Sequence, residues 1–438
     1  MRRNFIAKFI LLGMLLAPLT LAAAADLLSI YQQATTNDPV YKSAEAARQT
    51  ALEAVPQSRA QLLPSLIFSV AKTRNSQDVV SGSSLLFAKD TQGYTLSLTQ
   101  PIYHSDYFTQ LAQADTAAAQ AEANFAAAEQ DLIVRSAQYY FSVLAAKDNL
   151  DFSYAEKKAL EHQLEQTKQR FDVGLIAITD VQEAQAAYDL VVAQTIDAEN
   201  QLSSQFEALH ELTNQYQDAV APLSDAMPLI SPDPNNIDSW SQQAIDNNLT
   251  LQVAILAVQS AQDDIDIAKS GHLPQLDLTA SHAYADSTGG DFGARETRDN
   301  SVTLQLTVPL YQGGGTSSRV RAAEGRYQQT LEQLEQQKRA TDRHARDGYR
   351  SVLAAIKRVK ALQQAVVSAQ SALQATEAGL EVGTRTTVDV LNSRRNVYRA
   401  QRDLAQARYD YILNTLRLKQ VTGQLQATDI EQVNRWLH

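Results

Sequence analysis

The feature that most constrains the fold of this chain is a long run without helix-breaking residues. Residues 102–173 contain neither Gly nor Pro. A helix of about 67 residues is roughly 100 Å long, and a globular domain cannot bury an element of that length. In residues 111–130 small Ala side chains form narrow stripes between Gln, Asp and Glu. This pattern is typical of close lateral helix packing with water on two sides, as in a coiled coil or the wall of a hollow tube.

The chain also repeats itself at an offset of about 208 to 210 residues. Four strings match in the same order: 63–66 with 273–276, 95–103 with 303–311, Val173-Gly174 with Val382-Gly383, and Asp180-Val181 with Asp389-Val390. This agreement indicates a duplicated unit. Four of the eleven prolines lie between the copies and predict a linker. The predicted organisation is a first repeat (25–221), a linker (222–236) and a second repeat (237–438).

Each repeat has the same predicted order of elements. A helical segment (40–61 or 251–270) is followed by a β-hairpin, 65–103 in the first repeat and 275–311 in the second. The strands are predicted from residues that alternate with period two, such as Leu66, Phe68 and Val70. We expect four strands of roughly ten residues, joined by loops near 75–92 and 286–300. The remaining predicted elements are two long helices (102–173 and 317–377) and two return helices (180–215 and 388–422).

The N-terminus has the pattern of a secretory signal peptide. Arg2, Arg3 and Lys8 precede an apolar run over 9–21, and four alanines at 22–25 supply a cleavage site. We predict a signal peptide at 1–24. An N-terminal membrane anchor is the less favoured alternative, because the run is shorter than the ~20 residues that a spanning helix needs.

Composition excludes several classes of function. The chain has no Cys, which excludes a disulfide framework, thiolate metal sites and an N-terminal lipoprotein anchor. Its formal net charge of −11 argues against a nucleic-acid binder, which normally has a concentrated basic face.

In an exported protein, strands with one apolar and one polar face indicate a transmembrane β-barrel. A soluble β-layer packed on helices predicts the same alternation and stays open as an alternative. Four strands cannot close a barrel, for which about eight are needed, and open edges are not tolerated in lipid. The chain must therefore oligomerise if its strands enter a membrane. Two copies would give about eight strands with a filled interior, and three would give about twelve with room for a channel.

Four strings carry a resemblance to a known family: 31–34, 170–182, 271–280 and 382–391. In these strings, and over essentially the whole mature chain, the sequence resembles the TolC family of outer-membrane efflux and secretion channels. The resemblance implies an α+β membrane protein and a homotrimer. A twelve-stranded transmembrane β-barrel would continue as a twelve-helix periplasmic α-barrel. It also implies two partners, a periplasmic adaptor protein and an inner-membrane pump or ABC exporter.

The residues at the helix turns are the candidate functional residues. From the sequence, Thr179 with Gln182 fits a capping box, and Asp180 and Asp389 fall in first helical turns, where a carboxylate complements the helix dipole. The resemblance adds that these turns form the periplasmic gate. Thr179 and Asp180 match positions that bond to an arginine, matched here by Arg385.

The match at the gate is incomplete. A tyrosine that joins the gate links in the family is Leu380 here, and the second of two aspartates at the entrance is Asn392. Asp389 alone would supply an acidic ring, close to Arg394 and Arg395. We therefore expect weaker cation binding at the entrance and one fewer link within each chain.

Gly174 and Gly383 match the family positions at which the adaptor docks. Considered without the resemblance, they predict turns that need a positive φ.

Other functions fit the sequence less well. The seven histidines are scattered, His210-Glu211 lacks a second His four residues on, and Gly313-Gly314-Gly315 lacks the GK[ST] of a phosphate loop. We therefore predict no enzymatic activity, and no cofactor or metal. The alternative function is a periplasmic coiled-coil adaptor. Such an adaptor also has a long helical hairpin, but it has one, whereas this chain has two. The sequence does not decide between export of small toxic compounds and secretion of proteins.

Overall fold

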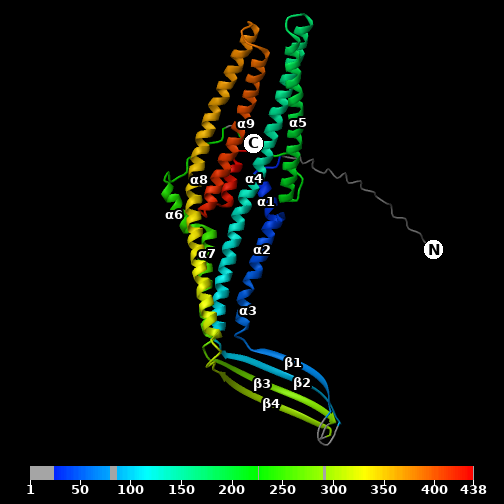
Figure 1. The fold of residues 1–438 in the computed structure, drawn as a ribbon, viewed down its shortest axis with the longest axis vertical. Helices are drawn as coiled ribbons and strands as arrows, with labels where there is room; N and C mark the ends of the chain where they lie inside the picture. The colour runs from blue at the N-terminus through cyan, green and yellow to red at the C-terminus, as the bar shows by residue number, and fades with distance from the viewer. Residues whose placement is uncertain (1–23, 79–85, 225, 290–292, 438) are drawn as a thin grey trace, which may run out of the picture.

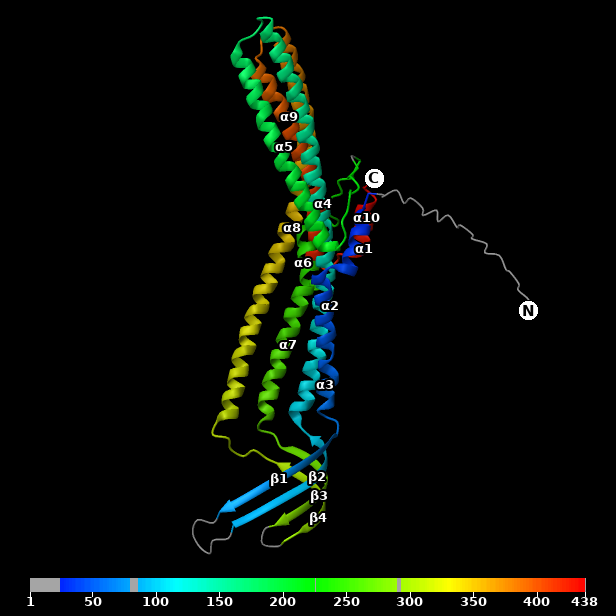
Figure 2. The ribbon, with the colours of Figure 1, turned by 90° about the vertical axis from the view of Figure 1, so that its right-hand side faces the viewer.

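The computed structural model describes residues 24–78, 86–224, 226–289 and 293–437, so the predicted signal peptide (1–24) lies almost entirely outside the described residues. The described chain forms a long rod of helices with a four-stranded sheet at one end (Figure 1). The turns between the long helices lie at the opposite end, and the shorter helices lie along the rod (Figure 2).

Two helices of exceptional length run along the rod. α4 extends over Ser105–Asp172, which is 68 residues, and α8 over Gly315–Glu381, which is 67 residues. Each turns back into a shorter helix, α5 (Ile178–Thr213) or α9 (Thr387–Val421), so the chain has two antiparallel helical hairpins. The prediction of long helices followed by return helices is confirmed, and α8 is longer at both ends than the predicted 317–377.

Gly348 lies inside α8 without ending it. A Cβ added there would lie 3.3 Å from Leu418 Cδ1 on α9. The glycine therefore lets the two helices of this hairpin approach closely, and this contact offsets the helix-propensity cost of about 1 kcal/mol relative to Ala.

Shorter helices pack beside the long ones. The chain forms α1 (Leu27–Asn37), α2 (Pro39–Leu52) and α3 (Ala54–Ala60) before the first strand pair, α6 (Ile237–Asn247) and α7 (Leu249–Ser270) before the second, and α10 (Ala427–Asn434) near its end. The helix predicted at 40–61 is divided at Glu53 into α2 and α3. Pro56 explains the division, because it has no N–H to donate to the carbonyl of Leu52.

The sheet is antiparallel, in the order β1 (Ser65–Asp78), β2 (Leu86–Tyr103), β3 (Gln275–Gly289) and β4 (Arg295–Thr307). Both predicted hairpins form, and β2 pairs with β3 to join them. The register places the alternating apolar residues on one face. Leu98 of β2, for example, lies between Leu66 of β1 and Ala280 of β3.

The strands extend further than their apolar pattern predicts. Residues 75–78 and 86–92 continue the ladder between β1 and β2, although they were expected in a loop. Residues 286–287 and 295–300 do the same between β3 and β4. The backbone ladder does not need apolar side chains. Arg74 and Asp90 pair across the two strands instead, with Nε and Oδ1 2.8 Å apart.

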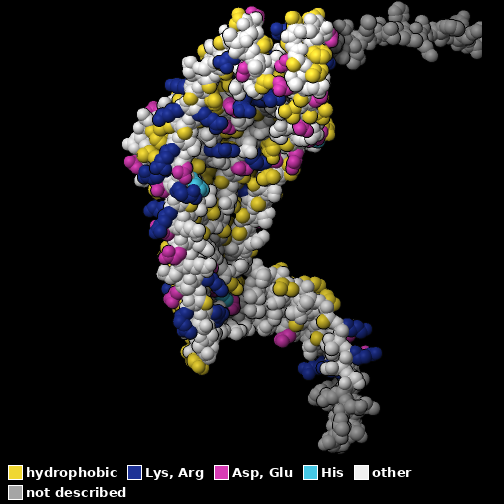
Figure 3. All heavy atoms as spheres, turned by 45° about the horizontal axis from the view of Figure 1, so that its top comes forward, with side chains coloured by type: hydrophobic (Ala, Val, Ile, Leu, Met, Phe, Trp, Pro, Cys, Tyr) yellow, Lys and Arg dark blue, Asp and Glu magenta, His cyan; other side chains and the backbone are white. Residues whose placement is uncertain are grey.

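The apolar face of the sheet is not covered by other described residues. Leu66 is 65% exposed, Val70 73% and Val302 76%. Figure 3 shows hydrophobic side chains along the sheet, with charged side chains gathered toward its far end. In addition, β1 and β4 each pair on one side only within the described residues. An exposed apolar face with two open edges indicates a surface that meets lipid or further protein.

A large group of buried apolar side chains, here called the central core, lies around the middle of the rod. Tyr140 and Leu144 of α4, Leu209 of α5, and Tyr411 and Leu418 of α9 belong to it. The predicted linker packs against this core, because Met227 is buried in it and Leu223 forms an isolated bridge with Leu437. The linker is therefore packed against the core.

Candidate functional site at the helix turns

Both hairpin turns contain a glycine in the left-handed region. Gly174 has a φ of 75° and Gly383 a φ of 77°. One residue further on, the N–H of Leu175 donates to the Arg170 carbonyl at 2.9 Å, and the N–H of Thr384 donates to the Gly379 carbonyl at 2.8 Å. These bonds close the last turns of α4 and α8 in the way that a positive-φ glycine permits. The expectation of positive φ at both glycines is confirmed, whereas their role in adaptor docking stays a prediction.

The first turn of α5 differs from its prediction. The helix begins at Ile178, and its N-cap is Ala177, which has no side chain that can cap. Thr179 is therefore inside the helix, and the predicted capping box with Gln182 is wrong. The pattern T-x-x-Q misled the prediction because the chain becomes helical two residues before the pattern requires. Asp180 does lie in the first turn, as predicted.

The first turn of α9 has the capping box that α5 lacks. Thr386 is the N-cap, and the N–H of Asp389 donates to its Oγ1 at 3.2 Å. In return the Asp389 carboxylate accepts from the N–H of Thr386 at 2.9 Å and from its hydroxyl at 2.9 Å. The bonds from Thr386 hold the pKa of Asp389 below its usual value, and the charge of Arg385 adds to this effect. The sequence signal was T-x-x-D, in which the Asp side chain is one methylene shorter than the Glu of the usual box.

The three predicted gate residues lie at one end of the molecule but on two different hairpins. Thr179 and Asp180 are in α5, and Arg385 is in the turn before α9. Figure 1 shows both turns at the same end of the rod. Among the described residues, the side chains of Asp180 and Arg385 form no hydrogen bond or ion pair. Both are exposed or half-exposed, so within one chain they are free to bond elsewhere. Their link stays a prediction.

The Arg394 side chain bonds to groups other than Asp389. Arg394 was expected close to Asp389, but its guanidinium bonds to Glu377 of α8 and to the Ala159 carbonyl of α4. This contact between hairpins was missed in the sequence, because it depends on two helices that are far apart in the chain. Leu380 lies in the last turn of α8 and Asn392 in the second turn of α9, and neither side chain forms a hydrogen bond among the described residues.

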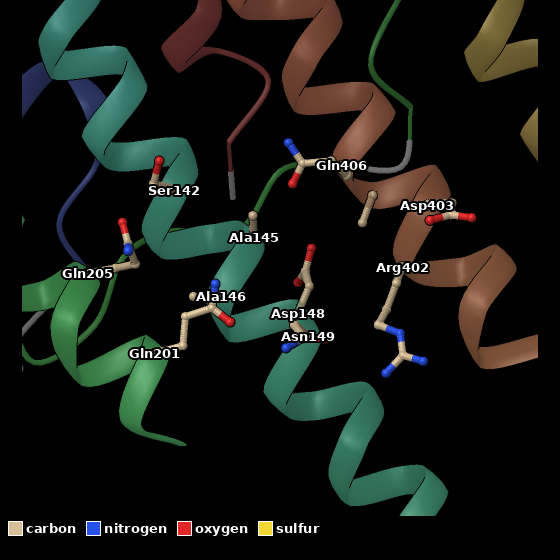
Figure 4. A pocket seen from close by; sticks show the side chains of 11 residues that line it. Ser142, Ala145, Ala146, Asp148, Asn149, Gln201, Gln205, Arg402, Asp403 and Gln406 are labelled. Carbon is tan, nitrogen blue, oxygen red and sulfur yellow. The ribbon is translucent and has the colours of Figure 1, made fainter. Parts of the chain in front are cut away.

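A polar groove of about 430 Å³ lies between α4, α5 and α9, next to the central core. Figure 4 shows Asp148 and Asn149 on α4, Gln201 and Gln205 on α5, and Arg402, Asp403 and Gln406 on α9 around it. Tyr409 donates to the Asp148 carboxylate at 2.6 Å. Burial raises the pKa of Asp148, and the bond from Tyr409 opposes this rise. The bond from Tyr409 therefore fixes the Asp148 carboxyl on the α4 side of the groove.

Two general observations concern metal ions and membrane-spanning helices. Within the described residues, no group of three or more His, Asp or Glu side chains is placed to hold a metal ion. No helix in that part of the chain has both the length and the apolar character of a membrane-spanning segment.

Comparison with known proteins identifies the family. The model of the outer membrane efflux protein family matches residues 30–215 and 240–424. The chain belongs to this family. It is 40% identical to the outer membrane protein TolC of Vibrio cholerae over 94% of both chains. It is also 28% identical to the alkaline protease secretion protein AprF of Pseudomonas aeruginosa, over 94% of this chain and 87% of AprF.

The fold agrees with a solved structure of the same kind. The structure of CusC, a transmembrane channel, superposes with a TM-score of 0.78 over 92% of both chains, at 16% identity. As a member of the outer membrane efflux protein family, the chain is an outer-membrane exit duct whose helices extend into the periplasm. The adaptor alternative is therefore not retained.

Proposed function

We propose that three copies of this chain form one continuous duct across the outer membrane and the periplasm. The observation that carries this proposal is the four-stranded sheet, with its exposed apolar face and its two open edges. Lipid does not tolerate an open edge, so β1 of one copy must pair with β4 of the next. Three copies give a barrel of about twelve strands, which is wide enough for a channel.

The helical hairpins form the periplasmic part of the duct. Three copies contribute twelve helices to its wall. The turns of the hairpins lie at the end away from the sheet (Figure 2). Thr179 and Asp180 of one hairpin bond to Arg385 of a neighbouring hairpin and hold this entrance closed. Such exposed pairs are worth about 0 to 1 kcal/mol each, so modest forces can open them. Asp389 forms an acidic ring at the entrance.

The partners follow from the position of the entrance. A periplasmic adaptor docks at the turns around Gly174 and Gly383, where Val173, Leu175 and Val382 are 70%, 68% and 75% exposed. Apolar side chains exposed to this degree at a tip suit a protein partner. The adaptor connects the duct to an inner-membrane pump or ABC exporter. The cargo is small toxic compounds, secreted proteins or both, and the similarity to AprF favours a role in secretion.

The test is the single-channel conductance of the purified mature protein in a planar bilayer, together with its mass in detergent. We expect about three times the mass of one chain and a small, steady conductance. Arg385→Ala and Asp180→Asn should each raise the conductance several-fold, because each removes a link at the entrance. Arg326→Ala is the matched control, since Arg326 is an exposed arginine in α8 far from the turn. A monomer, or a protein that never inserts, would contradict the proposal.

A further inference from the structure

Near the entrance, the two hairpins of one chain are joined by a narrow contact, here called the hairpin seam. Its apolar part is a small cluster of Leu160 from α4, Ala187 and Val191 from α5, and Leu391 from α9. Leu391 is 5% exposed, so it inserts from one hairpin into the other. This cluster is separate from the central core.

Arg394 forms the polar part of the seam. Its Nη2 lies 2.6 Å from Glu377 Oε1 on α8, and its Nη1 donates to the Ala159 carbonyl on α4 at 3.1 Å. The first bond lies within its own hairpin and fixes the direction of the guanidinium. The second crosses to the other hairpin. The Arg394 side chain is 19% exposed, so these bonds are better shielded from water than an ordinary surface pair.

Glu156 lies on the same side of α4 as Ala159, one turn further from the entrance. It is 3% exposed, and its Oε2 has no hydrogen-bond partner among the described residues. The nearest positive charge is Arg402 of α9, with Nη2 and Oε2 3.8 Å apart. Arg395 and Arg399 of α9 also act on it through space. A buried carboxylate is therefore attracted toward the basic face of α9 without being fully bonded to it.

We infer that Arg394 is the positioning residue that holds the two hairpins of each chain together in the closed entrance, and that Glu156 attracts the basic face of α9 toward α4 one turn further along the seam. This inference rests on the proposed gate. It also fits the end of α8, where the Leu380 side chain has no hydrogen-bonding group. The contacts of Arg394 with Glu377 and Ala159, here called the seam clamp, lie seven residues into α9, about 10 Å along the helix from its start.

The packing beside the clamp leaves room for movement. A groove of about 500 Å³ lies between α4, α8 and α9, lined by residues that include Ala159, Gln163, Glu377, Arg394 and Tyr398. Because the hairpins do not pack tightly there, the guanidinium bonds carry more of the contact than they would in a filled core. Loss of these bonds frees the α8–α9 hairpin to turn about the central core.

The first experiment compares conductances. Arg394→Met should raise the fraction of time that the channel is open by about tenfold, because it removes a charged hydrogen bond across the seam. Arg394→Lys keeps the charge but not the forked donors, so it should also raise the open fraction. Glu377→Gln leaves the bond to Ala159 in place and should have a smaller effect. If Arg394→Lys has the open fraction of the wild type while Arg394→Met does not, the loss of a positive charge in the lumen explains the result. The inference is then wrong.

The second experiment measures the seam directly. The chain has no Cys, so Lys168→Cys on α4 and Gln374→Cys on α8 give unique sites for spin labels, both at exposed positions. Trimers with one labelled chain among unlabelled chains report the distance between the hairpins of that chain. We expect a longer and broader distance with Arg394→Met, and no change with Glu161→Gln, an exposed glutamate of α4. An unchanged distance would overturn the inference.

The two proposals fail in different ways. A wild-type protein that is monomeric or does not insert contradicts the trimeric duct itself. A wild-type trimer with a small conductance, unaffected by both Arg394 variants, leaves the duct in place and overturns only the seam clamp.

Discussion

The central core and the hairpin seam join the same two hairpins in very different ways. In the described residues, the central core contains 32 buried apolar side chains, and the apolar cluster of the seam contains four. Burial of an apolar side chain contributes roughly 1.5 to 3 kcal/mol, so the core fixes the hairpins and the seam only restrains them. The hairpins are therefore anchored near their middle and free to move near their turns. On the proposed function, the entrance can therefore open without unfolding of the core.

The largest expected effect is in the anchored region. Asp38 is 2% exposed, caps α2 by accepting from the N–H of Tyr41 at 2.9 Å, and lies 2.6 Å from Arg135 Nη2. Asp38→Ala should lower the free energy of unfolding by about 3 to 5 kcal/mol, because Arg135 then loses its buried partner. Asp131→Ala removes the more exposed partner of Arg135 and should have little effect. Urea unfolding monitored by circular dichroism measures both variants.

A second effect in the core is smaller. Tyr409 is 4% exposed and donates to Asp148 at 2.6 Å. Tyr409→Phe should destabilise the protein by about 1 to 3 kcal/mol, because the buried carboxylate loses a donor. Tyr398→Phe is the control, since the Tyr398 hydroxyl has no hydrogen bond among the described residues. Equal melting temperatures for the two variants would show that the core does not depend on this bond.

The stability that the seam contributes should depend on pH in a way that the stability of the core does not. Burial raises the pKa of Glu156, and Arg402, Arg395 and Arg399 of α9 oppose the rise. Because the folded-state pKa is above the unfolded one, the native state holds the proton more tightly. The stability that this group contributes is full below about pH 4.5 and is lost as the pH rises through the folded-state pKa.

Glu156→Gln should therefore remove a decrease in stability that the wild type shows above about pH 4.5. The charged groups that face this carboxyl are the three arginines, and the Tyr398 hydroxyl lies near it. Glu161→Gln, at an exposed position of the same helix, should leave the pH profile unchanged. A wild-type profile that is flat over this range would mean that the arginines fully compensate the burial.

Most of the fold could be predicted from the sequence, because its strongest patterns are local. The absence of Gly and Pro over 102–173 predicts α4 to within three residues at its start and one at its end. The strand ends could not be predicted, since residues 86–92 are held by the backbone ladder rather than by apolar alternation.

The hairpin seam could not be predicted for a different reason. Glu156 and Arg394 are charged residues in long helices, and their burial depends on how α4 and α9 pack side by side. The gate residues could be predicted only in part. Asp180 lies in its helical turn as expected, but Thr179 does not cap α5, and the box at Thr386 was not recognised.

The smallest expected effect distinguishes the two turns. The Asp389 carboxylate is bonded by Thr386, and its pKa is below the usual value, so its charge is present above about pH 3.8 and is lost only as the pH falls through the folded-state pKa. Thr386→Val removes the hydroxyl and should shift that loss to higher pH. The measurement is block of the channel by a multivalent cation as a function of pH, with Asp389→Ala as the variant that loses block.

Thr179→Val is the matched control at the other turn. Because α5 has no side-chain cap, this variant removes a hydroxyl without changing the bonds of an aspartate, and the pH at which half of the block is lost should stay as in wild type. An equal shift in both variants would mean that the hydroxyls act on the lumen in general. A shift with Thr386→Val alone would assign the cation site to the capped turn of α9, and leave the uncapped Asp180 for the link between chains.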